Sequence, residues 1–206
     1  MATYQTDEEQ VEAIKKWWKE NGKSVIGGIA LGLLVVGGGK GWMEYSRVQA
    51  ENTSNLYESF SQAARGDDLE AAAQRADQLM TDAGKTAYAA FAALEMAKLR
   101  YQAGDKEKAR QRLQWVVDNT GEQGIKQLAQ LRLANLLLDM GKPDAAEALA
   151  QSVSQGGFGA EFDALKGDIA MAKGDKEAAR QAWQKALDQG AADVTALRMK
   201  LTSVGG

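Results

Sequence analysis

The chain has 206 residues and a formal net charge of -3, and it contains neither cysteine nor histidine. This composition excludes disulfides, thiolate or imidazole metal sites, and the Ser-His-Asp and Cys-His pairs of many hydrolases. Because acidic and basic residues are interspersed, nucleic acid is not an expected partner. One proline among many alanines and leucines favours an all-α protein.

Residues 1–23 are polar and predict an amphipathic helix on the cytoplasmic side of a membrane. Thr6 followed by Glu9 is a capping pattern. Apolar side chains then recur at helical spacing, and they are Val11, Ile14, Trp17 and Trp18. Such a segment either lies on the inner leaflet or contacts a cytosolic or membrane protein.

Residues 24–43 predict a single transmembrane helix. Positions 24–39 carry no charge, and their rise gives roughly 24 Å against a hydrocarbon core of about 30 Å. Each glycine in this run weakens a helix in water by about 1 kcal/mol, but in lipid a helix is the structure that satisfies the backbone. Tryptophans, a tyrosine and lysines flank the run as interfacial anchors. They are Trp17, Trp18, Lys23, Lys40, Trp42 and Tyr45.

Two alternatives to a retained anchor remain open. A cleaved signal peptide shares the basic flank and the apolar stretch, but no clear A-x-A site follows the run, and 23 mostly polar residues precede it. A helix buried in a soluble core is disfavoured by the tryptophans and lysines at both ends.

Basic residues near the two ends of the run predict its orientation. Four lysines precede it and two basic residues follow it: Lys15, Lys16, Lys19 and Lys23, then Lys40 and Arg47. This asymmetry places the N-terminus in the cytoplasm. We therefore expect a single-pass type II protein whose large C-terminal part is, in a bacterium, periplasmic.

Small residues form a stripe within the apolar run. Ser24, Gly28 and Gly32 are four residues apart, and Gly37 and Gly41 repeat the spacing. Small residues at this spacing let another helix backbone approach closely. The stripe predicts a membrane-helix packing site, although small residues could equally just fill a short span.

After a connecting helix at 44–65, residues 66–206 predict a tetratricopeptide-like helical repeat domain, an α-solenoid. A turn glycine is followed five residues later by alanine in four copies, at spacings of 38, 37 and 33 residues. These pairs are Gly66 and Ala71, Gly104 and Ala109, Gly141 and Ala146, and Gly174 and Ala179. The alanine lies where the second helix of a repeat crosses the first.

The first copy looks degenerate in this alignment. It has Arg75 and Gln78 where the other copies have small or apolar residues. Terminal repeats are often atypical, so we expect this copy to act as a cap or to merge with the helix that leaves the membrane.

First helices line the concave face of such a stack, and five side chains are candidate groove residues. They are Lys98, Tyr101, Gln102, Asn135 and Asp139. An apolar, methionine-containing surface beside them would suit extended or unfolded peptide. The apolar residues on this face fit ordinary packing equally well.

An enzyme is the competing class of function. Asp67 with Asp68, or Asp139 with Asp144, could be read as paired carboxylates for glycoside hydrolysis. All four fall at repeat turns, where aspartate commonly caps helices. We therefore expect no catalytic residue, no metal site and no cofactor.

Several segments together resemble the YfgM family, from one end of the chain to the other. They are DEEQVEAIKKWWKENGK, the glycine-rich span, TAYAAFAALEMAKLRYQAGDKEKARQRL, LRLANLLLDMGKPDAAEAL and KGDKEAARQAWQKAL. The resemblance implies an ancillary subunit of the SecYEG translocon in the bacterial inner membrane, with a periplasmic tetratricopeptide-like domain. It also implies a role beside PpiD, a membrane-anchored chaperone, without catalysis or cofactor.

The expected function is thus that of a scaffold. The anchor would hold the repeat domain near emerging chains, where it binds a chaperone partner or unfolded secreted proteins. The alternative is a membrane-anchored signalling or stress-response regulator that acts through the cytoplasmic segment, residues 1–23.

Overall fold

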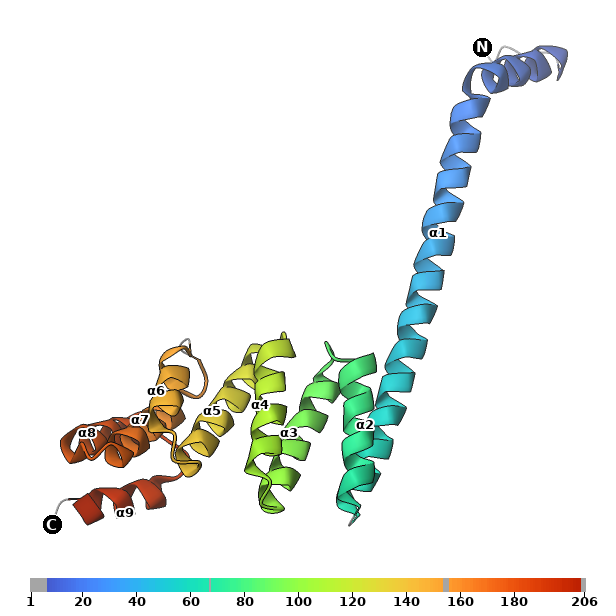
Figure 1. Ribbon diagram of the computed structural model, residues 1–206. Helices are drawn as coiled ribbons and strands as arrows, with labels where there is room; N and C mark the ends of the chain where they lie inside the picture. The colour runs from blue at the N-terminus through green and yellow to red at the C-terminus, as the bar shows by residue number, and fades with distance from the viewer. Residues whose placement is uncertain (1–6, 67, 154–155, 205–206) are drawn as a thin grey trace. The chain divides into compact units, whose positions relative to one another are not determined.

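The computed structural model describes residues 7–66, 68–153 and 156–204, and within these ranges the regular secondary structure is helical throughout. The chain divides into two compact units, Met1–Asn52 and Thr53–Gly206. The elements in chain order are α1 (Asp7–Arg65), α2 (Leu69–Asp82), α3 (Ala87–Gln102), α4 (Lys106–Asn119), α5 (Gln123–Asp139), α6 (Pro143–Gln151), α7 (Gly159–Ala172), α8 (Lys176–Asp188) and α9 (Val194–Val204) (Figure 1).

In the first unit, the described residues belong to α1. The helix runs without interruption from Asp7, so the predicted cytoplasmic, membrane and connecting segments share one element. The capping residue predicted for its start, Thr6, lies outside the described residues. A helical backbone across the apolar stretch is the structure that a membrane span requires.

Most side chains in the apolar stretch of α1 are exposed. Ile26, Leu33 and Leu34 are 58%, 69% and 72% exposed. By length and composition, α1 contains one stretch that could cross a membrane. Side chains this apolar and this exposed need a solvent other than water, as the transmembrane prediction requires.

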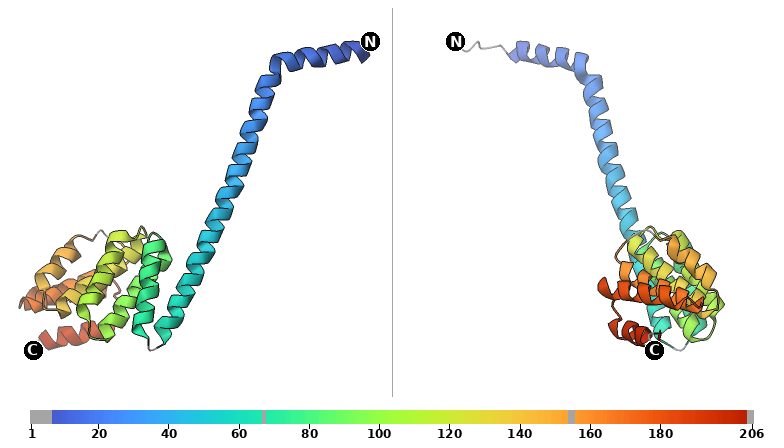
Figure 2. Two further views of the ribbon diagram at one scale, coloured as in Figure 1. Left: turned by 45° about the vertical axis from the view of Figure 1, so that its right-hand side comes forward. Right: turned by 90° about the vertical axis from the view of Figure 1, so that its left-hand side faces the viewer.

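The second unit is a stack of antiparallel helix pairs. Contacts connect consecutive helices from α2 to α9, and the views in Figure 2 show the pairs stacked in chain order. The pairs are α3 with α4, α5 with α6, and α7 with α8, and α9 packs on α8. This arrangement confirms the predicted repeat architecture.

Turn glycines end the first helix of three repeats. Gly104, Gly141 and Gly174 have φ angles of 81°, 70° and 86°, a region that an L side chain rarely adopts. At the first of these turns, the Asp105 amide donates to the Arg100 carbonyl at 2.8 Å, which satisfies a carbonyl at the helix end. The predicted glycine turns are therefore confirmed at these three positions.

The crossing alanines follow these turns. Ala109, Ala146 and Ala179 are each 0% exposed. No space for a larger side chain remains where the two helices of a repeat meet, as the spacing predicted.

The first copy has a different register from the predicted one. Asp68 caps α2 by accepting from a backbone amide three residues on, as Asp105 and Asp175 do for α4 and α8. Four residues after this cap stands Ala72, which is 0% exposed. The predicted pairing of the turn glycine with Ala71 is wrong, because the fully buried alanine, Ala72, stands six rather than five residues after Gly66.

Correcting the register also removes the apparent degeneracy of the first copy. The positions assigned to Arg75 and Gln78 belong to Ala76 and Leu79. Both of these side chains are 0% exposed, so α2 buries the same face as α4 and α8.

The first helix of this first repeat is the end of α1. Phe60 is 1% exposed and packs against Ala72, Leu79 and Met96. Burial of this ring joins residues 53–65 to the repeat unit, which therefore begins at Thr53 rather than at the predicted residue 66.

Helices α7, α8 and α9 are held together by the Trp183 ring and by polar contacts with Asp168. A Cβ at Gly167 of α7 would overlap the indole ring of Trp183 from α8. The Trp183 Nε1 donates to Asp168 at 3.0 Å, and Lys200 of α9 donates to the same carboxylate at 2.6 Å. These contacts fasten α9 to the last repeat.

Candidate functional site

Four of the five predicted groove side chains line one cavity of about 430 Å³. Lys98 and Tyr101 come from α3, and Asn135 and Asp139 come from α5. Gln102, the fifth, is exposed but does not line this cavity. The repeat fold brings the four together because α3 and α5 are the first helices of adjacent repeats.

The rest of this cavity is largely apolar. Its other lining residues are Leu94, Ala97, Ala109, Leu113, Arg132 and Leu136. Tyr101 stands at the edge with 47% of its surface exposed. An apolar floor with a polar edge suits the side chains and backbone of a peptide.

Asp139 is already engaged within the protein. Lys106 Nζ lies 2.8 Å from its carboxylate, and the Tyr101 hydroxyl also hydrogen-bonds to it. Hydrogen bonds from Lys106 and then Tyr101 hold the pKa of Asp139 below its usual range, while Asp139 raises the pKa of Lys106. The carboxylate therefore links α4 to α5 and orients the tyrosine.

The other two polar residues are partly engaged. Lys98 Nζ lies 2.9 Å from a Glu95 carboxylate oxygen. Asn135 Nδ2 donates to the Leu131 carbonyl at 2.9 Å, and among the described residues its side-chain oxygen has no donor. That oxygen can accept a hydrogen bond from a bound backbone amide.

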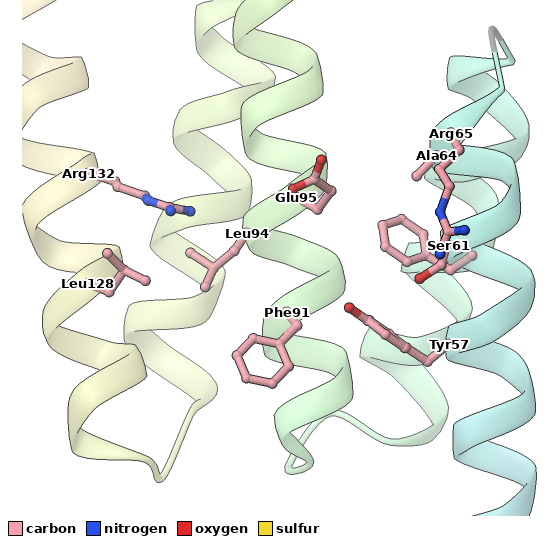
Figure 3. A pocket seen from close by; sticks show the side chains of 10 residues that line it. Tyr57, Ser61, Ala64, Arg65, Phe91, Leu94, Glu95, Leu128 and Arg132 are labelled. Atoms are coloured by element: carbon pink, nitrogen blue, oxygen red, sulfur yellow. The ribbon is translucent and has the colours of Figure 1, made fainter.

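A second cavity, of about 360 Å³, lies beside the first. It was not predicted from the sequence. Figure 3 shows its walls: α1 on one side, α3 in the middle and α5 on the other. The lining residues are Tyr57, Phe60, Ser61, Ala64, Arg65, Phe91, Leu94, Glu95, Leu128 and Arg132. The spacing of Leu56, Phe60 and Ala64 is the signal that could have placed 53–65 in the repeat.

The small-residue stripe in α1 is uncovered. An added Cβ at Gly28, Gly32, Gly37 or Gly41 would meet nothing within 4 Å, and Ser24 is exposed. Packing of this stripe against a second membrane helix stays a prediction.

The described members of the proposed carboxylate pairs are engaged with other groups of the protein. Asp68 accepts from the Ala71 amide at the start of α2, and Asp139 pairs with Lys106. Asp144 lies 2.8 Å from Lys173 Nζ, while Asp67 lies outside the described residues. The described members thus cap helices or form ion pairs.

Comparisons with known proteins agree with this architecture. The family described as "Tetratricopeptide repeat-like domain" matches residues 15–206. A solved tetratricopeptide repeat protein from Parabacteroides merdae shares the fold, with a TM-score of 0.53 and 21% identity, over 76% of this chain and 59% of that one.

Two sequence relatives are similar over almost their whole length. A protein of Haemophilus influenzae called "Ancillary SecYEG translocon subunit" is 31% identical, over 89% of this chain and 90% of the relative. A protein of the same name from Escherichia coli is 30% identical, over 89% of this chain and 88% of the relative. The chain therefore belongs to the YfgM family of tetratricopeptide repeat-like proteins, the family of these ancillary translocon subunits.

Proposed function

We propose that this chain is a membrane-anchored, non-enzymatic ancillary subunit of the SecYEG translocon. Its similarity to two relatives of that name, over about nine-tenths of the chain, is the observation that supports the proposal most strongly. The anchor in α1 would tether the repeat unit near the channel. Tethering gives an effective concentration of about millimolar over a short connection, so weak contacts suffice.

The repeat unit would hold a periplasmic chaperone of the PpiD type and unfolded secreted chains. Lys98, Tyr101, Asn135 and Asp139 line a cavity with an apolar floor, which supports binding of a peptide there. Gln102, exposed next to this cavity, would contact a longer ligand at its edge. The function needs no cofactor, because proximity and binding are its mechanism.

The anchor would cross the inner membrane once, with residues 1–23 in the cytoplasm and the repeat unit in the periplasm. The excess of lysines before the apolar run supports this orientation. The uncovered stripe of Ser24, Gly28, Gly32, Gly37 and Gly41 would pack against a span of a translocon subunit or of the chaperone.

A regulator that signals through residues 1–23 is the second candidate. The exposed apolar side chains of this segment favour it, since Trp17 and Trp18 are 53% and 51% exposed. They equally suit the membrane surface. Deleting residues 1–18, while leaving Lys19 and Lys23 as flanking charges, separates the two: a scaffold keeps its translocon partners, whereas a regulator loses its output.

Affinity purification of the full chain in mild detergent, followed by mass spectrometry, tests the proposal. We expect SecYEG subunits and a single-span periplasmic chaperone to co-purify. Photocrosslinkers at Ser24, Gly28 and Gly32 should capture one of these spans. Recovery of lipid alone at all three positions would contradict the membrane-packing part, and absence of SecYEG from the purified material would contradict the proposal itself.

A further inference from the structure

The two cavities of the repeat unit are parts of one groove. Leu94 and Arg132 line both of them. We call the combined surface the α1/α3/α5 groove, because the end of α1 and helices α3 and α5 form its walls. Figure 3 shows its first part, with Arg65 on α1 and Arg132 on α5 on either side of Phe91 and Glu95 of α3.

The charges that line this groove do not balance. Glu95 pairs with Lys98 at 2.9 Å, and Asp139 pairs with Lys106 at 2.8 Å. Arg65 and Arg132 also line the groove, and neither has an ion pair among the described residues. Two guanidinium groups without an ion-pair partner among the described residues therefore face the same surface of a chain whose formal net charge is -3.

Exposed aromatic rings lie along the same surface. Phe91 and Tyr101 are 45% and 47% exposed, and they lie on the same helix, α3. Tyr57 also lines the groove, but it is half-buried, and its ring centroid lies 5.2 Å from that of Tyr88. Water-exposed rings on a helical face offer binding energy to apolar side chains.

We propose that the α1/α3/α5 groove binds a short acidic amphipathic segment of a partner protein. Its apolar side chains contact Phe91 and Tyr101, and its carboxylates pair with Arg65 and Arg132, whose planar guanidinium groups suit carboxylate geometry. The inference rests on the proposed scaffold function, since the segment belongs to a protein that the scaffold holds. The inference therefore assigns a negative charge to the bound segment of that partner.

Peptide binding to the full chain in a non-ionic detergent tests the assignment. The probes are fluorescein-labelled peptides with the same leucine and phenylalanine residues and either two glutamates, two glutamines or two lysines. We expect the glutamate peptide to bind about tenfold more tightly than the glutamine peptide by fluorescence anisotropy. At about 1 M salt this preference disappears, because screening shortens the range of the charges.

Matched variants locate the effect. Arg65→Gln with Arg132→Gln should abolish the preference for the glutamate peptide and leave binding of the glutamine peptide unchanged. Lys176→Gln with Arg198→Gln removes the same charge from exposed positions on α8 and α9 that have no ion pair among the described residues, and it should preserve the preference. Phe91→Ala should weaken binding of all three peptides.

Three results would overturn the inference. They are equal binding of the glutamate and glutamine peptides to the unsubstituted chain, equal loss of preference in both double variants, and self-association of the chain that blocks every peptide. SecYEG co-purification is measured on the same preparations as a separate readout. Retained SecYEG without a preference for the acidic peptide refutes this inference alone, whereas loss of SecYEG from the unsubstituted chain refutes the proposed function.

Discussion

Glycine and leucine have opposite surroundings in the two units of this chain. In the apolar stretch of α1, a Cβ added at Gly32 would meet nothing within 4 Å, whereas at Gly167 it would overlap the ring of Trp183. Leu33 is 69% exposed in the first unit, and Leu79 is 0% exposed in the second.

The difference shows that helix in the two units has different causes. The repeat helices are stabilised by burying alanine and leucine against neighbouring helices. Most side chains of the apolar part of α1 are exposed, and its helix fits the requirement of a membrane span, in which an unpaired backbone group costs several kcal/mol. Substitutions should therefore act on insertion in one unit and on unfolding in the other.

The largest expected effect is on membrane insertion. Leu33→Asp should make insertion of the apolar stretch less favourable by about 3 to 4 kcal/mol, because aspartate at the centre of a span replaces a favourable leucine. Extraction of membranes with alkaline carbonate should release the variant. Gln74→Asp, at an exposed position of α2, should leave the protein in the pellet and change the free energy of unfolding by less than about 0.5 kcal/mol.

Glycine-to-alanine substitutions should affect stability in the repeat unit but not in the apolar part of α1. Gly167→Ala should lower the free energy of unfolding of the repeat unit by about 1 to 3 kcal/mol, because the new methyl group displaces Trp183. Gly32→Ala has no neighbour to displace and should leave that free energy unchanged. Urea denaturation of the full chain in detergent measures both, and equal effects at the two positions would refute the distinction.

A smaller effect concerns the buried carboxylate of α7. Asp163 is 5% exposed, and its oxygens lie 3.1 Å from Lys166 and 2.9 Å from Lys185. Burial tends to raise the pKa of Asp163, but hydrogen bonds from Lys185 and Lys166 outweigh it and leave the pKa lowered. Asp163→Asn should therefore lower the free energy of unfolding by about 1 kcal/mol at neutral pH.

The pH dependence of this effect has a defined sign. A carboxylate with a lowered folded pKa stabilises the fold above its unfolded pKa of about 3.9, and this stabilisation is lost as the pH falls through the folded pKa. The gap between the melting temperatures of the native chain and Asp163→Asn should thus narrow below about pH 4. Glu122→Gln, at an exposed position, is the control and should show no comparable narrowing.

The smallest effect is expected at an exposed ion pair. Lys173 pairs with Asp144 and Glu147, and their hydrogen bonds raise its pKa to about 12. A raised lysine pKa gives stabilisation that is complete below the usual value of 10.5 and is lost as the pH rises through about 12. Lys173→Gln should lower the melting temperature slightly and by the same amount from pH 6 to 9; a change in that difference within this range would contradict the assignment.

Sequence spacing predicted the regular part of the fold well. Gly104, Gly141 and Gly174 were recognisable because a positive φ angle requires a particular residue type at a fixed offset. In the first copy the buried alanine, Ala72, stands six residues after Gly66 instead of five, so this copy was assigned the wrong register. Turn length is a local backbone property that a glycine–alanine pattern does not measure.

The groove was predictable only in part. Four of five predicted side chains line a common cavity because adjacent first helices repeat the same face. The neighbouring cavity was not predicted, because its walls combine Tyr57, Phe91 and Arg132, which are far apart in sequence. The engagement of Asp139 by Lys106 and Tyr101 likewise depends on packing between helices.

The central claim is that a membrane helix holds the repeat unit on the periplasmic side, beside the translocon. Protease treatment of spheroplasts and of inside-out vesicles, followed by detection of the C-terminal part, tests it most directly. If the repeat unit is periplasmic, residues 53–206 should be digested in spheroplasts and protected in inside-out vesicles. Protection in spheroplasts with digestion in inside-out vesicles would contradict it.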